Sequence, residues 1–161
     1  MIKHLLGRSI FPPRYAWFLE GRWRKLVLSP ARLQQRLALS QGMTVLEIGT
    51  GGGYYAHPLS TFVHLLIALD IQAEMLQRLR RKPAGSQLVS VRGDATQLPL
   101  AENSIDVVIA VTVLGEVPSA ERTIAEVRRV LRPSGLFSVS EHLPDPDFLP
   151  LSRVSSLCQE G

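Results

Sequence analysis

Residues 45–53 of the chain read Val-Leu-Glu-Ile-Gly-Thr-Gly-Gly-Gly. An apolar run ends on an acid, Glu47, and glycines follow at positions 49, 51, 52 and 53. A strand that leads into a glycine-rich turn and then a helix is typical of an α/β sheet where it approaches a nucleotide-like ligand. Glycine suits such a turn because it has no Cβ to clash with a close neighbour. We therefore predict that this stretch forms the first strand and the binding loop of an α/β domain.

The segments after this loop alternate between strand and helix patterns. Five short apolar runs are expected to be strands: 44–48, 65–69, 88–91, 105–113 and 136–140. Helices are expected between them at 54–61, at 73–82 and after Ser119, which can cap a helix, and residues 133–135 (Pro-Ser-Gly) should form a turn before the last strand. This alternation predicts a Rossmann-like, doubly wound, mainly parallel five-stranded sheet with helices on both faces.

Residues 1–41 are expected to be a helical, basic and aromatic extension to a domain formed by residues 42–161. Within residues 1–36, eight basic side chains stand against the single acid Glu20, a net charge of +7, although the whole chain carries only +4. A helix is predicted to begin at Pro30, to run through Leu39 and to end at Gly42. The extension could be a lid, a helix that docks on an anionic membrane, a nucleic-acid contact or a plain packed helix. Of the external partners we favour the membrane contact through residues 1–36 and expect no nucleic acid.

Composition excludes several classes of protein. The 161 residues fit one domain, and no apolar stretch approaches the roughly 20 residues that a membrane span needs. We find no convincing signal peptide, and the single cysteine, Cys158, excludes an intrachain disulfide, so we expect a cytoplasmic protein that is at most peripheral to a membrane. His4, His57 and His64 lack metal-ligand spacing, and no metal site is predicted.

The glycine loop narrows the choice of ligand. A G-x-G-x-x-G dinucleotide pattern that starts at Gly49 fails at Tyr54, and only the weaker G-x-G-x-x-A form fits, from Gly51 to Ala56. Glu47 would repel a diphosphate, whereas it suits a ligand with positive charge or with hydroxyl and amine donors. S-adenosylmethionine has an adenosine, a sulfonium and an amino group, and it meets these requirements better than a nicotinamide dinucleotide, which stays a third alternative.

Two further acids end strands downstream. Asp70 lies 19 residues after Gly51, where a carboxylate can accept hydrogen bonds from both ribose hydroxyls, and Ile71 can line the adenine. Asp94 can accept a hydrogen bond from an exocyclic amine, and the backbone N–H of Ala95 can donate to a ring nitrogen. Because the carboxyl ends of parallel strands meet at one edge, these residues are expected to gather on one rim.

These motifs, in this order, resemble the class I S-adenosylmethionine-dependent methyltransferases, nearest the UbiE-like (ubiquinone/menaquinone methyltransferase-like) group. The resemblance covers about residues 42–141 and is carried by segments 45–53, 69–70, 93–95, 98–99, 106–108 and 126–135. It implies S-adenosyl-L-methionine as cofactor. The donor-binding residues that it implies are Glu47, Gly49, Thr50, Gly51, Asp70, Ile71, Asp94 and Ala95.

The implied activity is methyl transfer by in-line displacement to a small or lipophilic acceptor. Proximity, orientation and water exclusion can supply most of such catalysis, and a general base is needed only if the acceptor loses a proton. Candidates for that base are Glu116, Glu141 and His142. The family often has Leu-x-His at positions 114–116, where this chain has Leu-Gly-Glu, so a histidine role there is in doubt.

The chain is short after the last expected strand. The family domain usually continues with a helix and an antiparallel hairpin, but only a helix from Leu151 to Cys158 fits the remaining residues. The last strand would then be an exposed edge through which two copies of the chain could pair. A donor-binding but inactive module, or a partner subunit, is therefore the alternative to an active methyltransferase.

Overall fold

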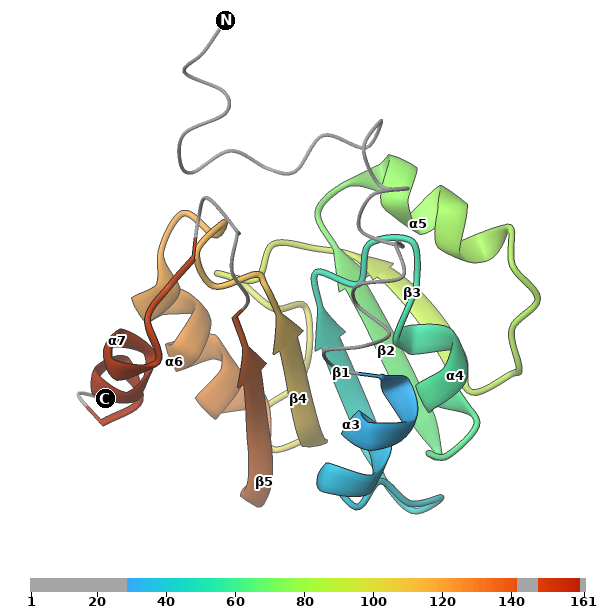
Figure 1. The fold of residues 1–161 in the computed structure, drawn as a ribbon, viewed down its shortest axis with the longest axis horizontal. Coiled ribbons are helices and arrows are strands. Elements are labelled where there is room, and N and C mark those ends of the chain that lie inside the picture. Colours follow the sequence, from blue (N-terminus) through green and yellow to red (C-terminus); the bar gives the residue numbers. More distant parts are fainter. Residues whose placement is uncertain (1–28, 142–147, 160–161) are drawn as a thin grey trace, which may run out of the picture.

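The structure, a computed structural model, describes residues 29–141 and 148–159 (Figure 1). Along the chain the elements are α3 (Pro30–Arg36), β1 (Thr44–Ile48), α4 (Ala56–Ser60), β2 (Leu65–Asp70), α5 (Ala73–Arg80), β3 (Leu88–Arg92), β4 (Ile105–Val111), α6 (Ala120–Val130), β5 (Leu131–Ser140) and α7 (Leu151–Gln159). None of the helices in these two ranges is long and apolar enough to cross a membrane.

The five strands form one sheet in the order β3-β2-β1-β4-β5, and every neighbouring pair is parallel. The predicted sheet is thus confirmed. Strand order reverses at β1, which pairs with β2 on one side and with β4 on the other. In an open parallel sheet the ligand crevice lies outside the carboxyl ends of the strands at such a reversal. The glycine loop directly follows β1 and so lies at this point.

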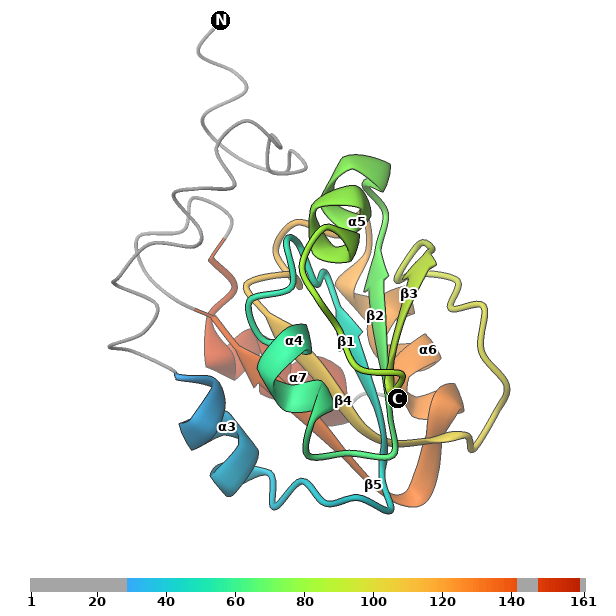
Figure 2. The same ribbon diagram turned by 90° about the vertical axis from the view of Figure 1, so that its right-hand side faces the viewer.

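Side chains of β1, β2 and β4 pack into two different cores, one on each face of the sheet. Val45 joins the cluster beneath α3, α4 and α5, which includes Leu59 and Leu79. Leu46 joins the opposite cluster, which includes Val127 and Val130 of α6. Figure 2 shows the sheet with α4 on one face and α6 on the other, as expected for strands buried on both sides.

Helix α3 ends earlier than predicted. It stops at Arg36, and Ala38, not Gly42, takes the left-handed conformation at φ 48°. The Ala38 N–H donates to the Gln35 carbonyl and the Leu39 N–H donates to the Gln34 carbonyl, which is the Schellman pattern of a helix end. The break allows Leu39 to turn into the core beneath the sheet, so tertiary packing overrides the glycine signal.

Replacing Ala38 by glycine is expected to raise the free energy of unfolding by about 1 kcal/mol, because glycine takes the left-handed conformation without the Cβ clash. Ala125 is exposed inside α6 and provides the matched control. Ala125→Gly should lower the same quantity by about 1 kcal/mol. Urea unfolding measures both; a loss of stability in Ala38→Gly would show that this helix end is wrong.

The predicted turn at residues 133–135 is a bulge inside β5. Ile105 pairs with Leu131 and Val107 pairs with Leu136, so β5 advances five residues while β4 advances two. The extra residues are turn formers, and a Cβ on Gly135 would lie 2.8 Å from Leu131 Cδ2. The turn residues are therefore absorbed without interrupting the strand.

The remaining boundaries lie close to the predictions, with one informative exception. Ser119 is the N-cap of α6 and accepts a hydrogen bond from the Arg122 N–H, as predicted. Strand β4 ends at Val111 instead of 113, because Thr112 adopts φ 53°, which a β-branched residue takes only under strain. The strained residue lies at the carboxyl edge of the sheet.

Residues 29–41 and 148–159 can be compared with the predicted limits of the domain. Leu33 and Leu39 pack in the same core as β1, whereas residues 1–28 lie outside the described part of the chain. Among the residues that the structure describes, β5 pairs only with β4, and residues 148–159 contain α7 and no strand. The domain boundary at residue 41 stays a prediction.

Candidate active site

The glycine loop is fastened to β2 by its backbone. The N–H groups of Gly49 and Thr50 both donate to the Leu69 carbonyl, at 2.9 and 3.1 Å. Gly49, Gly51 and Gly53 all have positive φ, at 69°, 54° and 82°. A Cβ on Gly49 would lie 2.5 Å from Val113 Cγ2, whereas a Cβ on Gly51 would meet no atom within 4 Å. At Gly49 the loop is therefore tight against Val113, which follows β4, and at Gly51 it is open, so a ligand can approach the backbone there.

Glu47 is a buried acid beneath this loop. Its side chain is 3% exposed, and one carboxylate oxygen accepts a hydrogen bond of 2.9 Å from the Thr50 hydroxyl. Because a buried carboxylate needs partners, this bond fixes the orientation of Glu47 at the end of β1. The acid and the loop are thus held as one unit.

Asp70 joins the end of β2 to the same loop. One carboxylate oxygen accepts from the Gly51 N–H at 2.8 Å, and the other accepts from the Gln72 N–H at 2.9 Å. Burial raises the pKa of Asp70 above its ordinary value, and the backbone N–H groups of Gln72 and Gly51 offset part of that shift. A carboxylate offers about four acceptor positions, so about two remain for hydroxyl donors of a ligand.

Asp94 and Ala95 present a complementary pair of polar groups. Asp94 Oδ1 accepts from both the N–H and the hydroxyl of Thr96, at 2.8 Å each. Among residues 29–141 and 148–159, neither Asp94 Oδ2 nor the Ala95 N–H has a hydrogen-bond partner. An acceptor beside a donor matches the amine and ring nitrogen on the edge of adenine.

These features fit an S-adenosylmethionine site. The structure brings together on one rim Glu47, Gly49, Thr50, Gly51, Asp70 and Asp94, as the sequence predicts. Ile71 stands on the same rim with 41% of its surface exposed, available to cover a flat ring. The individual binding roles stay predictions.

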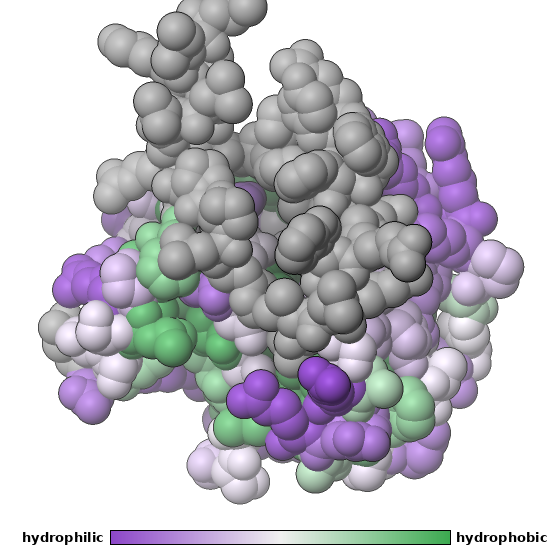
Figure 3. All heavy atoms as spheres, in the orientation of Figure 1, coloured by the Kyte–Doolittle hydropathy of each residue, from purple (hydrophilic) through white to green (hydrophobic). Residues whose placement is uncertain are grey.

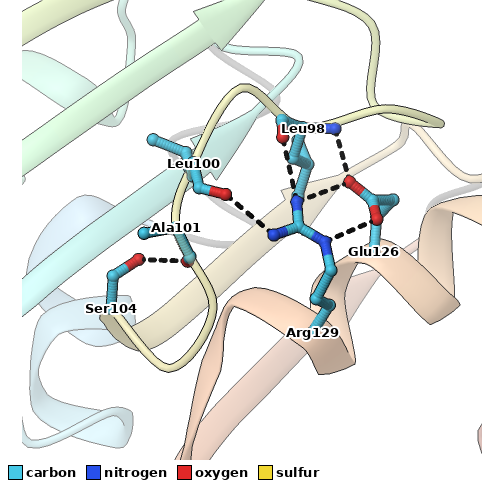
Figure 4. A network of polar contacts seen from close by, with 6 residues as sticks. All are labelled: Leu98, Leu100, Ala101, Ser104, Glu126 and Arg129. Atoms are coloured by element: carbon cyan, nitrogen blue, oxygen red, sulfur yellow. Dashed lines mark hydrogen bonds and ion pairs between the residues drawn. The ribbon is translucent and has the colours of Figure 1, made fainter.

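Residues 98–100, a few positions after Asp94 and Ala95, are anchored by Glu126 and Arg129 of α6, as Figure 4 shows. Arg129 pairs with the Glu126 carboxylate at 2.7 Å and donates to the carbonyls of Leu98 and Leu100. Glu126 also accepts from the Leu98 N–H at 2.7 Å. A single side-chain pair thus satisfies three backbone groups of an irregular segment, which otherwise has no sheet partner.

Removing Arg129 should make the segment after Asp94 and Ala95, the predicted adenine-binding residues, more mobile. In Arg129→Ala we expect faster amide hydrogen exchange across residues 95–104 and weaker donor binding, because the hydrogen bonds from Arg129 to the Leu98 and Leu100 carbonyls and to the Glu126 carboxylate disappear. Arg122→Ala, which removes an exposed arginine of the same helix, is the control and should change neither. Unchanged exchange at Leu98 in Arg129→Ala would contradict the anchoring role.

The three candidate bases have different positions. Glu141 directly follows β5, and its Oε1 accepts from the Leu114 N–H at 3.3 Å. Glu116 is half-buried in the loop after β4, where its N–H donates to the Val113 carbonyl. His142 lies outside the described residues. Glu141 therefore serves at least to hold the loop after β4, and proton transfer by any of the three stays a prediction.

Sequence reasoning missed two contacts with the glycine loop. Val113 packs against Gly49, and the Lys82 ammonium donates to the Gly52 carbonyl at 3.1 Å. Lys82 lies just after α5, and its contact with Gly52, 30 residues earlier in the chain, depends on tertiary structure. No group of three or more potential metal ligands occurs in the described ranges.

Comparison with known proteins agrees with this geometry. A family model described as "Methyltransferase domain" matches residues 46–139. Demethylmenaquinone methyltransferase of Renibacterium salmoninarum is 33% identical over 83% of this chain and 52% of its own length. Sterol methyltransferase-like 1 of Botryococcus braunii is 30% identical over 79% of this chain and 34% of its own length. The chain thus spans between about a third and a half of these relatives.

A solved SAM-dependent methyltransferase from Aquifex aeolicus has the same fold. It superposes with a TM-score of 0.85 at 22% identity, over 94% of this chain and 88% of that one. The superposition covers nearly all of both chains, so the five-stranded architecture is shared as a whole.

Proposed function

We propose, because this chain belongs to the class I S-adenosylmethionine-dependent methyltransferases of the UbiE-like group, that it transfers a methyl group to a small or lipophilic acceptor. The cofactor of this family is S-adenosyl-L-methionine, which carries the methyl group on a positively charged sulfur. That charge makes the methyl carbon electrophilic before any protein group acts on it. The activity of the whole protein and the identity of its acceptor are parts of the proposal.

The proposal rests mainly on Asp94 Oδ2 and the Ala95 N–H, which have no hydrogen-bond partner among residues 29–141 and 148–159 and lie on the same rim as the open backbone at Gly51. Asp94 Oδ2 and the Ala95 N–H would hold the adenine edge, and Asp70 would accept from the ribose hydroxyls. The Glu47 carboxylate would place negative charge near the donor's cationic groups. These residues bind and orient the donor, and none of them needs to exchange a proton during the reaction.

The names of the relatives support a lipophilic acceptor. One is named for demethylmenaquinone, and several others are named for sterols. Sterols and demethylmenaquinone share a large apolar body. We therefore propose the shared chemistry, an apolar acceptor, and leave the acceptor atom open.

Calorimetry with S-adenosylmethionine and with S-adenosylhomocysteine tests the donor site. We expect one binding site for each, and we expect methyl label from S-adenosylmethionine to enter a lipid extract in the presence of the protein. The absence of binding heat for both molecules at high protein concentration would overturn the proposal.

A donor-binding but inactive module is the second candidate. It is favoured by the Leu-Gly-Glu sequence at residues 114–116, where the family often has histidine. Donor binding without label transfer to any extract would support this candidate over an active enzyme.

Two further partners are proposed for other parts of the chain. The basic residues 1–36 would dock a cytoplasmic protein on an anionic membrane, and the free edge of β5 would pair with a second copy. Vesicle sedimentation that is unchanged after deletion of residues 1–28 would remove the first idea. A monomer at all concentrations in light scattering would remove the second.

A further inference from the structure

Helix α5 is attached to the glycine loop at both of its ends. Just before the helix begins, Asp70 accepts a hydrogen bond from the Gly51 N–H. Just after it ends, the Lys82 ammonium donates to the Gly52 carbonyl at 3.1 Å. Figures 1 and 2 both place α5 beside α4, the helix that follows the loop. The helix therefore joins the residue predicted to hold the ribose to the other side of the glycine loop.

His57, in α4, makes a further contact with the end of α5. Its Nε2 lies 3.0 Å from the Leu79 carbonyl oxygen, which belongs to the last turn of that helix. Because a carbonyl oxygen only accepts hydrogen bonds, Nε2 carries the hydrogen and donates it. The other ring nitrogen, Nδ1, is buried and has no hydrogen-bond partner among residues 29–141 and 148–159. Only one of the two ring nitrogens thus ties α4 to α5.

The imidazole ring also packs against the last glycine of the loop. A Cβ on Gly53 would lie 2.8 Å from His57 Cδ2 and 3.2 Å from Leu79 Cδ1. Gly53 has φ 82°, so both its conformation and the space around it favour glycine. The loop, the ring and the end of α5 are therefore in mutual contact.

This contact bears on donor binding because the predicted binding groups lie on both sides of it. Asp70 and Ile71 directly precede α5, and the open backbone of Gly51 lies in the loop. A ligand that touches both sides binds more tightly when their separation is already fixed, since less of the protein must become ordered on binding.

We infer that His57 is a positioning residue for the donor site. Its Nε2 hydrogen bond to Leu79, together with the contact between Lys82 and Gly52, holds the end of α5 against the glycine loop before the donor arrives. The inference rests on the proposed function for the identity of the ligand, whereas the attachment itself is tested in the protein without ligand. His57 acts through the loop and the helix, and it neither touches the donor nor gives up a proton.

Two amide substitutions at position 57 separate the hydrogen bond from the bulk of the ring. A glutamine amide can reach the place of Nε2, whereas the shorter asparagine amide reaches only the place of Nδ1. Calorimetry with S-adenosylhomocysteine measures affinity, and circular dichroism checks that each variant is folded. We expect His57→Asn to bind on the order of tenfold more weakly and His57→Gln to bind within about twofold of the parent. His64→Asn, which changes an exposed histidine just before β2, is the matched control and should bind as the parent does.

Equal affinity in His57→Gln and His57→Asn would overturn the inference, because the Nε2 hydrogen bond would then have no effect on the donor site. Weaker binding in both would assign the effect to the volume of the ring, and parental binding in both would remove the effect altogether.

Lys82 provides a second test that leaves the core untouched. Figure 3 shows hydrophilic side chains over the side of the molecule on which α5 lies, and Lys82 and Arg81 are both exposed. Lys82→Met should weaken donor binding by several-fold, and Arg81→Met, which removes the neighbouring charge, should not. If the His57 variants do not fold, parental donor affinity in Lys82→Met overturns the inference without them.

Amide hydrogen exchange in the ligand-free protein tests the attachment by itself. The N–H groups of Gly53 and Lys82 donate to the Thr50 and Leu79 carbonyls, so both should exchange slowly in the parent. We expect exchange at both to be on the order of tenfold faster in His57→Asn and unchanged in His57→Gln. Parental exchange in His57→Asn would contradict the attachment. A failure of the proposed function would instead appear as absent donor binding in the parent, with these differences in exchange still present.

Discussion

Replacing Asp70 by asparagine is expected to weaken S-adenosylmethionine binding by about 100-fold. The carboxylate accepts from two backbone N–H groups and has acceptor positions left for the two ribose hydroxyls. Hydrogen bonds to a charged group contribute about 1.5–3 kcal/mol each, and the amide can replace only part of them. Calorimetry measures the change, and Glu74→Gln, which alters an exposed acid four residues away, should leave affinity unchanged.

Asp70 should also make both folding stability and donor affinity depend on pH. Burial raises the pKa of Asp70 from its ordinary value of 3.8, so the folded protein without ligand holds this proton to higher pH than the unfolded chain does. Folding stability from this group is therefore present at low pH and falls as pH rises through the raised pKa. Donor binding has the opposite dependence, because the ribose hydroxyls need the ionised form. As pH is lowered, S-adenosylmethionine affinity should begin to fall at a higher pH than it would for an aspartate with an ordinary pKa. The fall in affinity that comes from protonation of Asp70 should be absent in Asp70→Asn.

The two glycines of the loop should respond differently to alanine. Gly49→Ala places a Cβ 2.5 Å from Val113 Cγ2 at φ 69°, so we expect a loss of about 3 kcal/mol of stability from backbone strain and overpacking together. Gly51→Ala meets no protein atom and should lose only about 1–2 kcal/mol, from its positive φ. Its methyl group would instead occupy the open side of the loop, so donor affinity should fall.

A double-mutant cycle separates clash from strain. Val113→Ala removes the atoms that the new Cβ would meet, and it should recover part of the stability lost in Gly49→Ala. The same change should not help Gly51→Ala, whose Cβ has no neighbour. If Val113→Ala does not recover stability in Gly49→Ala, Val113 does not confine Gly49 as the structure places it.

The regular part of the fold could be predicted because its signals are local. Strand β1 matches its predicted limits because an apolar run is followed directly by glycines, and Ser119 caps α6 through a bond that spans only three residues. The carboxyl-edge rim followed from topology, since Asp70 and Asp94 come at the ends of parallel strands. These predictions need only periodicity, turn chemistry and the handedness of crossovers.

The incorrect or missing predictions depend on contacts between distant segments. Ala38 takes the left-handed conformation because Leu39 must reach the core, although Gly42 carries the stronger local signal. The bulge at residues 133–135 is set by pairing with β4, which a turn rule does not contain. The anchoring of residues 98–100 by Arg129 and the strained backbone at Thr112 likewise arise from neighbours that only the folded chain supplies. The motif at residues 126–135 was recognised as part of the resemblance, but its physical role as an anchor was not.

A crystal structure of the complex with S-adenosylhomocysteine would test the central claim most directly. We predict the adenine edge within hydrogen-bond distance of Asp94 Oδ2 and the Ala95 N–H, both ribose hydroxyls on the Asp70 carboxylate, and the ligand chain along the open side of Gly51. A ligand bound elsewhere, or one whose ribose leaves Asp70 bonded only to Gly51 and Gln72, would contradict the account.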